Sequence, residues 1–322
     1  MTRILTQGDL ASVLRLDDCI AAVEGAFGDY AAGRLPKPES LGVRAEHGTF
    51  HIKAARSSLF AAKVNANFPG NPARHGLPTI QGVVVVMDLE RGTLLGLLDS
   101  ALITTRRTAA ATAVAAKHLS RADASSAAII GCGALSGATV EALRVVRPLT
   151  RLLLWDTDLA ARNACARELA ASSGIEVTAA ASLDAAVEGA DIIVTCTPSR
   201  RPFLEVRHLR AGVFIAAVGA DNPEKSEIAP ELMERVSIVP DLLEQAATMG
   251  DLHHAIRSGL VTRDDVHGEL GDVVTGQVPA RRADDEIFLF DSTGTALQDV
   301  VVASLALERA TSAGIGSQIA FT

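Results

Sequence analysis

The second half of the chain alternates short aliphatic segments with helical ones, and this rhythm constrains the fold more than any other feature. It begins near Ala124, where SSAAIIGCGALSGATVEALRVV is typical of a strand, a glycine turn and a helix. TRLLLWDTDLAARNACARELA repeats that order, and the strand-like pieces IEVTAA, DIIVTCT, GVFIAAVG, VSIVPD and EIFLFDS follow. Alternating strands and helices imply right-handed crossovers, so we expect one parallel sheet in an α/β fold.

The residues before Ala124 follow a different pattern. LDDCIAAVEGAFGDYAAG has its apolar residues on one helical face. Short aliphatic strands separated by turns follow from Thr49 to Leu98, and a helix is expected over residues 101–119. The last helix, GTALQDVVVASLALERA, is apolar on more than one side, so it should return to the first domain or meet a partner chain. We therefore predict one domain from residues 1–120 and 296–322, and a second from 121–295.

Composition excludes several classes of partner. The net charge is −8 and no dense block of Lys and Arg occurs, which argues against binding to nucleic acid or an anionic membrane. The N-terminal residues MTRILTQGDL lack the pattern of a signal peptide, and no apolar run is long enough to span a bilayer. The four cysteines form no CxxC pair and no metal-ligand cluster, so we expect a reducing compartment, the cytoplasm, and no metal.

A dinucleotide-binding turn is the clearest motif. GCGALS at residues 131–136 follows an apolar strand and opens a helix. The first glycine permits the tight turn, the second lets pyrophosphate approach the backbone, and the helix N-terminus offers N–H groups and a positive dipole. Ser136 stands where glycine or alanine is usual, but it is also small. We predict a Rossmann-type domain in which Gly131, Gly133, Ala134 and Leu135 contact the cofactor.

The next strand ends at Asp156, which lies 156 − 131 = 25 positions after the first glycine. A carboxylate there can accept hydrogen bonds from the ribose hydroxyls and would repel a 2′-phosphate. We therefore expect NAD rather than NADP. The alternative interpretation is that Asp156 caps the following helix, for which Thr157 and Asp158 are also suitable.

Blocks along nearly the whole chain resemble the ornithine cyclodeaminase/mu-crystallin family, which includes an archaeal-type alanine dehydrogenase. They are KVNANFPGNPARHGLPTIQG, ITTRRTAAATAVAAKHLSR, IIGCGALSG, TCTPSRRPF, AVGADNPEKSEI, LLEQAATMGDL and FDSTGTALQD. The resemblance implies a homodimer whose subunits bind a small amino or imino acid between a Rossmann domain and a mixed α/β domain. That mixed domain, built from both chain ends, would bind substrate and form the dimer contact.

The resemblance also implies that Arg44, Lys63 and Arg107 hold the substrate carboxylate. Arginine suits this role because its planar fork can bind both carboxylate oxygens. Arg106 is adjacent to Arg107, but neighbouring helix residues point about 100° apart, and the TAA spacing selects Arg107. Arg106 is then a solvated or dimer-contact residue. Lys63 could also contact the imine-forming centre, and the alternative is a lysine on an edge strand whose amine reaches solvent.

Asp221 is the leading acid/base candidate on the same resemblance, because a carboxylate at a strand end can take or return the proton of the substrate amine. Asn222-Pro223 follows it, so Asp221 could also cap a helix. Small residues at other strand ends would line the ribose and nicotinamide, with Gly219 allowing close approach of the ring. The remaining expected cofactor contacts are Thr108, Thr197, Pro198, Ser199, Val218 and Ser292.

One departure from the family pattern bears on the substrate. Ornithine cyclodeaminases hold the distant amine of the substrate with an acidic residue in the strand FHIKAA, whereas this chain has no Asp or Glu between Thr49 and Asn65. His51 and Lys53 would repel that amine. We therefore favour an NAD(H)-dependent amino-acid dehydrogenase or imine reductase that transfers hydride at the alpha carbon. Ornithine cyclodeaminase itself and a non-catalytic, mu-crystallin-like binding protein are the alternatives.

Overall fold

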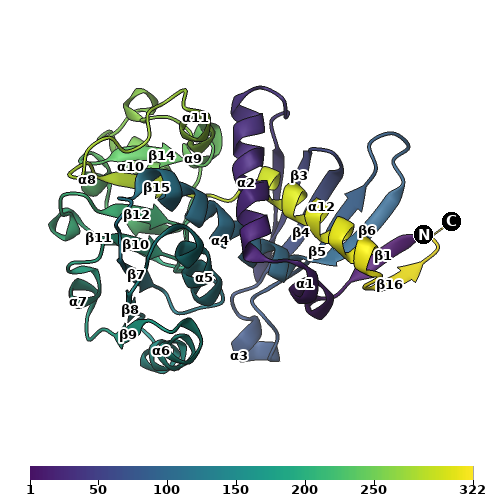
Figure 1. Ribbon diagram of the computed structural model, residues 1–322, viewed down its shortest axis with the longest axis horizontal. Coiled ribbons are helices and arrows are strands. Elements are labelled where there is room, and N and C mark those ends of the chain that lie inside the picture. The colour runs from purple at the N-terminus through teal and green to yellow at the C-terminus, as the bar shows by residue number, and fades with distance from the viewer. Residues whose placement is uncertain (322) are drawn as a thin grey trace. The chain divides into compact units, whose positions relative to one another are not determined.

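The computed structural model describes residues 1–321, the side chains of residues 72 and 73 excepted. It divides into two compact units, each with a seven-stranded sheet of its own (Figure 1). Unit 1 comprises Met1–Arg107 and Thr295–Thr322, and unit 2 comprises Thr108–Gly294. The first division falls inside helix α4 (Ser100–Leu119) and not at its end, where the sequence placed it. Residue 322, the last of the predicted first domain, lies outside the described residues.

The sheet of unit 1 is mixed and uses both ends of the chain. Its strands pair antiparallel, except that β1 runs parallel to β6. The predicted strands between Thr49 and Leu98 are β3 to β6, whereas β1, β2 and β16 were not predicted. In sheet order the strands are β16 (Ser317–Ile319), β1 (Thr2–Leu5), β6 (Leu94–Asp99), β5 (Ile80–Met87), β4 (Phe60–Asn67), β3 (Gly48–Arg56) and β2 (Glu39–Ala45).

Helices α2 (Leu16–Ala31) and α12 (Ala296–Ala313) pack on each other, and α12 also packs on β3, β4 and β5. The final helix therefore returns to the first domain, as predicted. Side chains along β4 and β5 alternate between buried and half-buried, so one face of the sheet is covered and the other is not. We call these the covered face, which carries Lys63, and the open face, which carries Val64. Two short helices, α1 (Gln7–Val13) and α3 (Asn71–His75), complete the unit.

The sheet of unit 2 is entirely parallel, which confirms the predicted Rossmann-type domain. Its central strands are mostly apolar and buried along their length, as expected for strands covered on both faces. The sheet order is β14 (Ser237–Pro240), β15 (Phe288–Asp291), β12 (Phe214–Ala217), β10 (Ile192–Thr195), β7 (Ser126–Ile130), β8 (Arg151–Trp155) and β9 (Glu176–Ala179).

The chain runs from β7 through β8 to β9 and then returns to β10 on the other side of β7. It continues through β12 to the edge strand β14, and β15 then lies between β12 and β14. The reversal between β7 and β10 is the point at which open α/β sheets bind their ligands. β11 (Arg200–Leu204) and β13 (Ser226–Ile228) form a separate two-stranded parallel sheet. The helices of unit 2 are α5 (Ser136–Val146), α6 (Leu159–Ser173), α7 (Leu183–Val187), α8 (Pro230–Met233), α9 (Leu243–Ala246), α10 (Asp251–Ser258) and α11 (Leu270–Thr275). Within residues 1–321, no helix is both long enough and apolar enough to cross a bilayer.

Candidate active site

The glycine turn joins β7 to α5 at the point where the sheet order reverses. Gly131 has a φ of 108°, and a Cβ there would lie 2.8 Å from the carbonyl oxygen of Cys196, so a side chain does not fit. A Cβ on Gly133 would meet no atom within 4 Å, which leaves open space beside the turn. Ala134 and Leu135 lead into α5, with Leu135 at its N-cap. The geometry thus fits a pyrophosphate, which needs close backbone approach and a helix N-terminus.

Asp156 lies beside this turn. Its Oδ2 accepts a hydrogen bond of 2.8 Å from the backbone N–H of Cys132, and its Oδ1 accepts one of 2.9 Å from the N–H of Asp158. Asp158, not Asp156, is the N-cap of α6, because its carboxylate accepts from the N–H groups of Ala160 and Ala161. Asp156 is therefore placed at the glycine turn, where a carboxylate can reach the ribose of a dinucleotide.

A buried carboxylate that the sequence did not single out organises the ends of β10 and β12. Glu227 Oε1 accepts 2.7 Å hydrogen bonds from the backbone N–H and the hydroxyl of Thr197. Its Oε2 accepts from the hydroxyl of Thr195 at 2.7 Å and from the N–H of Gly219 at 2.8 Å. A Cβ on Gly219 would lie 2.3 Å from the carbonyl oxygen of Thr197, so the two loops touch there. One carboxylate thus fixes two of the predicted cofactor loops.

Two further buried carboxylates extend this group. Asp251 Oδ1 accepts from the N–H groups of Glu227 and Ile228, at 2.7 and 3.0 Å, and Asp291 accepts from Leu252 N–H at 2.9 Å. Asp291 therefore binds the start of α10 and does not cap the final helix. Burial, reinforced by the charge of Asp251, raises the pKa of Glu227 to about 7. Burial likewise raises the pKa of Asp251 to about 6 and that of Asp291 well above its usual value.

Asp221 lies in the turn that follows β12. Its Oδ1 is 2.8 Å from Lys225 Nζ, and its side chain is 45% exposed. No helix begins at Asn222, because the next one, α8, starts at Pro230, so the helix-cap interpretation of Asp221 is wrong. The carboxylate is held by a lysine and remains half-exposed.

The other predicted cofactor residues also follow strands of unit 2, with one exception. Pro198 and Ser199 follow β10, Val218 follows β12, and Ser292 follows β15, where its N–H donates to Ala217 O at 2.9 Å. Thr108 is the exception, since it is buried within α4. All but Thr108 therefore lie at the carboxyl ends of parallel strands, the edge at which such sheets bind ligands.

Unit 1 contains a buried group of charges on the covered face of its sheet, which we call the cation group. Lys63 is 3% exposed, and its Nζ lies 2.8 Å from Asp299 Oδ1 and 3.3 Å from Thr104 Oγ1. Arg107 Nε lies 3.1 Å from the same Asp299 oxygen, and its Nη1 donates to Gln298 Oε1 at 2.8 Å. The structure thus brings together two of the three predicted carboxylate-binding residues. It also adds Asp299 and Gln298, which the sequence did not single out.

Several polar atoms of this group are buried without a hydrogen-bond partner among the described residues. They are Asp299 Oδ2, Asn65 Oδ1, Gln298 Nε2 and Arg107 Nε, the last being close to Asp299 but poorly aligned for a hydrogen bond. Such groups are rare in folded proteins, and each calls for a partner. The two acceptors match an ammonium group and the two donors match a carboxylate, which together are the polar groups of an amino acid.

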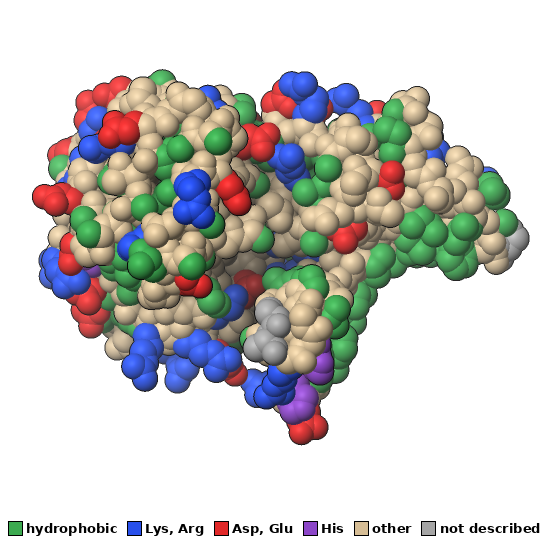
Figure 2. Space-filling model, turned by 90° about the horizontal axis from the view of Figure 1, so that it is seen from below, with side chains coloured by type: hydrophobic (Ala, Val, Ile, Leu, Met, Phe, Trp, Pro, Cys, Tyr) green, Lys and Arg blue, Asp and Glu red, His purple; other side chains and the backbone are tan. Residues whose placement is uncertain are grey.

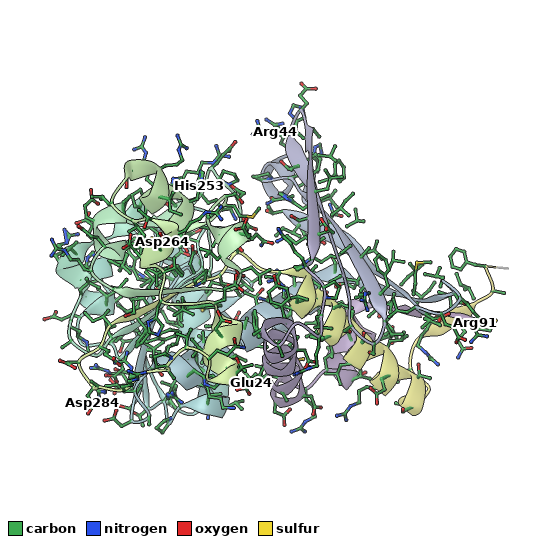
Figure 3. The ribbon with its side chains drawn as sticks, turned by 90° about the horizontal axis from the view of Figure 1, so that it is seen from above. Glu24, Arg44, Arg91, His253, Asp264 and Asp284 are labelled. Atoms are coloured by element: carbon green, nitrogen blue, oxygen red, sulfur yellow. The ribbon has the colours of Figure 1, made fainter. Side chains whose placement is uncertain are left out.

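Arg44 lies elsewhere on the same face. Its cross-strand partner is Thr49, whereas Lys63 is in register with Lys53 and Ser40. Arg44 is therefore four residues from the row of Lys63, or roughly 13 Å along the strands. It is exposed on edge strand β2, near the tip of the β2–β3 hairpin (Figure 3). Its role in carboxylate binding stays a prediction.

The buried lysine has a measurable consequence for stability. Burial is the main cause that lowers the pKa of Lys63 from 10.5 to about 7; Asp299 opposes this, and Arg107 and Lys53 reinforce it. Between these two values the unfolded chain binds a proton that the folded chain does not, so the contribution of Lys63 to stability should rise with pH across that window and be constant below it. We expect the free energy of unfolding to increase by about 1.4 kcal/mol per pH unit.

Urea denaturation at several pH values between about 7.5 and 9.5 measures this slope. Lys63→Met should lose it, while Lys37→Met, which removes an exposed lysine of the same unit, should keep it. A slope that is equal in wild type and Lys63→Met would show that Lys63 keeps its proton in the folded chain. The window avoids Glu227 and Asp251, whose raised pKa values lie at or below about 7.

The adjacent histidines of α10 bind backbone carbonyls. A ring nitrogen of His254 lies 2.8 Å from Lys225 O, and one of His253 (labelled in Figure 3) lies 3.3 Å from Ala247 O. Over the part of the chain that the structure describes, no three or more His, Cys, Asp or Glu side chains are grouped so that they could hold a metal ion. These histidines therefore orient α10 and the turn that holds Lys225.

Comparison with known proteins places these features in context. The model of the ornithine cyclodeaminase/mu-crystallin family matches residues 1–314. An archaeal alanine dehydrogenase, solved as a dimer with bound NAD, is 35% identical, with a TM-score of 0.96 over 100% of this chain and 99% of that one. The Δ1-pyrroline-2-carboxylate reductase of Thermococcus litoralis, solved with NADH and L-proline, is 28% identical (TM-score 0.93; 99% and 100% covered). The iminosuccinate reductase of Paracoccus denitrificans, solved with NAD⁺, is 29% identical (TM-score 0.89; 99% of each chain).

Proposed function

Since the chain belongs to the ornithine cyclodeaminase/mu-crystallin family, we propose that it is an NAD(H)-dependent oxidoreductase acting at the alpha carbon of a small amino or imino acid. The observation that carries this proposal is the cation group, in which Lys63 and Arg107 share one oxygen of Asp299. Arg107 and Lys63 share this one carboxylate, so their remaining hydrogen-bond donors can bind a substrate carboxylate, whose charge in turn favours the protonated form of Lys63. The three structural relatives bind NAD or NADH and are named for reactions of 2-amino or 2-imino acids.

We assign the cofactor to the glycine turn and the neighbouring strand ends of unit 2. Gly131 and Gly133 would admit the pyrophosphate, Asp156 would bind the adenosine ribose, and Thr197 and Gly219 would line the nicotinamide side. NAD⁺, when bound, supplies the acceptor for the hydride that leaves the alpha carbon. The Glu227 carboxylate fixes Thr197 and Gly219, so these loops are held before the cofactor binds.

Residues of the chain would bind the substrate and transfer its proton. Arg107 and Lys63 would hold the substrate carboxylate and so fix the position of the alpha carbon. Asp221 would take the proton that leaves the alpha amine as the carbon–nitrogen double bond forms, and return it in the reductive direction. Water added to that bond then gives a 2-keto acid and ammonia, whereas a cyclic imine would be reduced without hydrolysis.

A panel of substrates tests the proposal. NADH absorbance is followed with L-amino acids and NAD⁺, with 2-keto acids plus ammonia or methylamine and NADH, and with cyclic imines and NADH. We expect turnover with at least one of these classes. Proline formed from ornithine without net change in NADH would identify a cyclodeaminase instead. Tight NADH binding without any turnover would identify a binding protein.

The choice of cofactor is tested at Asp156. Asp156→Ser removes the negative charge that would repel a 2′-phosphate and the acceptor for the ribose hydroxyls, so the ratio of kcat/KM for NAD⁺ over NADP⁺ should fall by about tenfold or more. Asp158→Asn, which keeps an N-cap side chain on α6, is the matched control and should preserve the ratio. An unchanged ratio in Asp156→Ser would remove this residue from cofactor selection.

We propose that the open face of the unit 1 sheet forms a homodimer contact. It carries aliphatic side chains that are only half-buried, including Val64, Val83 and Val85, and continues to the exposed Val43 and Phe50. Figure 2 shows a band of hydrophobic side chains along this unit. Apolar surface of this extent is characteristic of protein interfaces, and the archaeal alanine dehydrogenase was solved as a dimer.

Light scattering tests the contact. The protein should have the mass of a dimer, and Val64→Glu, which places a charge at the centre of the open face, should yield monomers at micromolar concentration. Val145→Glu is the control, because Val145 is a 52% exposed valine on α5 of unit 2. A dimer that persists in Val64→Glu, or a monomeric wild type, would contradict the assignment.

We further propose that the protein works in the reducing cytoplasm. Cys19, Cys132, Cys165 and Cys196 are all free thiols. Proteins that function in oxidising compartments commonly pair their cysteines.

A further inference from the structure

We propose that Glu227 is a positioning residue that sets the affinity for the nicotinamide half of the cofactor, acting through the backbone of Thr197 and Gly219. The inference rests on the proposed function, because it concerns the cofactor site assigned there. It requires that the amide analogue of this side chain cannot replace the carboxylate. It also requires that the adenosine half of the cofactor binds without the help of Glu227.

The pattern of hydrogen-bond donors carries the first step, because each carboxylate oxygen of Glu227 accepts from one backbone N–H and one hydroxyl. Oε1 accepts from the N–H and the hydroxyl of Thr197, both at 2.7 Å. Oε2 accepts from the N–H of Gly219 at 2.8 Å and from the hydroxyl of Thr195 at 2.7 Å. A hydroxyl can turn and accept a hydrogen bond, whereas a backbone N–H can only donate. The two loops therefore require two acceptor oxygens, one for each N–H.

Glutamine at position 227 would offer only one acceptor. If the amide oxygen binds the N–H of Thr197, the amide nitrogen faces the N–H of Gly219, and the opposite orientation places it against the N–H of Thr197. A buried donor without an acceptor is costly, so one of the two loops should move towards water. Both loops keep their positions only when a carboxylate lies between them.

Glu227 has little freedom to adjust its own position. It lies in the middle of the buried strand β13 and is 0% exposed. Its backbone N–H donates to Asp251 Oδ1 at 2.7 Å. A Cβ on Gly219 would lie 2.5 Å from Glu227 Oε1, so the carboxylate is packed against the backbone that it holds. Movement of the side chain therefore cannot restore a contact that the amide loses.

The two halves of the cofactor site are held by different acids. Asp156 accepts from the N–H of Cys132 in the glycine turn at 2.8 Å, whereas Glu227 holds the loops that follow β10 and β12. Lys225, two residues before Glu227, supports the second loop from its other side by donating to Gly219 O at 3.2 Å. Loss of one Glu227 contact should therefore disturb the nicotinamide side and leave the adenosine side in place.

Calorimetric titration with NADH and with ADP-ribose, which lacks the nicotinamide, tests the inference. The full-length protein is titrated at pH about 8.5, where Glu227 of the wild type is ionised because its pKa is about 7. In Glu227→Gln the Kd of NADH should rise by about tenfold or more, because the arrangement that binds nicotinamide is populated less often. The Kd of ADP-ribose should stay within about threefold of wild type.

Asp191→Asn is the matched control, because it makes the same kind of change at the opposite edge of the sheet. Asp191 Oδ2 accepts from the N–H groups of Ser125 and Ser126, both at 3.0 Å, at the amino end of β7. This substitution should lower Tm and leave both Kd values within about twofold of wild type.

Thr195→Val is a second, milder variant, since it removes only a hydroxyl donor to Oε2 of Glu227. It should raise the Kd of NADH by about twofold to fivefold without changing that of ADP-ribose, and it carries the test if Glu227→Gln does not fold. Equal changes in the two Kd values, in Glu227→Gln or in Thr195→Val, would overturn the inference. An unchanged Kd of NADH in a folded Glu227→Gln would do the same.

These titrations need no turnover, so they separate the inference from the proposed function. If a substrate is turned over but Glu227→Gln affects NADH and ADP-ribose equally, the proposed function holds and the positioning role is refuted. If no substrate is turned over but the affinity for NADH falls selectively, the positioning role holds and the proposed reaction is refuted.

Discussion

Asp221→Asn is expected to lower kcat by about 10²- to 10⁴-fold while the dissociation constant of NADH stays within about twofold of wild type. The amide keeps the shape of the side chain but cannot accept the proton that leaves the substrate amine. Asp221 is 45% exposed and is held by Lys225 in a turn, so the substitution leaves no buried charge without its partner. Stopped-flow NADH absorbance measures the chemical step, and quenching of Trp155 fluorescence by NADH measures binding.

The control for this prediction is Asp158→Asn, which makes the same chemical change at an N-cap where Asn serves as well as Asp. It should leave kcat within about twofold of wild type. Full activity in Asp221→Asn would exclude proton transfer by this residue. Loss of NADH binding together with activity would show instead that Asp221 holds the cofactor loop.

Arg107→Met should lower kcat/KM for the amino-acid substrate by roughly 30-fold to several thousandfold. Truncating one partner of a buried, charge-assisted contact costs about 2–5 kcal/mol, and the substitution also removes the second cation beside Asp299. The loss should appear mainly as a higher KM, because the proposed carboxylate contact forms in both the ground state and the transition state. NADH affinity should be unchanged, since the proposed cofactor contacts are made by other residues.

Arg106→Met is the matched control, because it removes the neighbouring guanidinium of the same helix, which points about 100° away. It should change kcat/KM by less than about threefold. The kcat/KM of Arg107→Lys should lie between those of wild type and Arg107→Met, since lysine keeps the charge and loses the planar fork. Equal losses in Arg106→Met and Arg107→Met would show that the helix, and not one guanidinium, was perturbed.

Much of the fold could be predicted because its strands have strong local signals. Most strands of unit 2 are short apolar runs, and β3 to β6 are short aliphatic segments bounded by turns. The missed strands lack such signals: β1 and β16 have four and three residues, and β2 is exposed along its length. The positions of β1 and β16 also depend on pairing between residues far apart in the chain, such as Thr2 with Ile319, which no local pattern reveals.

The candidate site was predicted less completely, because a buried charged residue needs an oppositely charged partner that can lie far away in the sequence. The family resemblance indicated Lys63 and Arg107, but the Asp299 that contacts both lies within an apolar helix segment, ALQDVVVASL. A carboxylate among aliphatic residues is itself a signal, since buried acids need partners, and it could have been matched to the buried lysine. The role of Glu227 was harder to predict from the sequence, because the four groups that donate hydrogen bonds to it come from two segments away from Glu227 in the chain.

The chain order of the two units has a consequence for synthesis on the ribosome. Unit 2 occupies the continuous stretch Thr108–Gly294, whereas unit 1 needs residues on both sides of it. Domains generally fold as units while the chain emerges. Unit 2 can therefore fold before α12 is synthesised, at a time when unit 1 is still incomplete. Until α12 has been synthesised, Lys63 and Arg107 lack the countercharge of Asp299, and burying these two side chains against their strand and helix is unfavourable. The nascent N-terminal segment should therefore be the part that chaperones and proteases meet first.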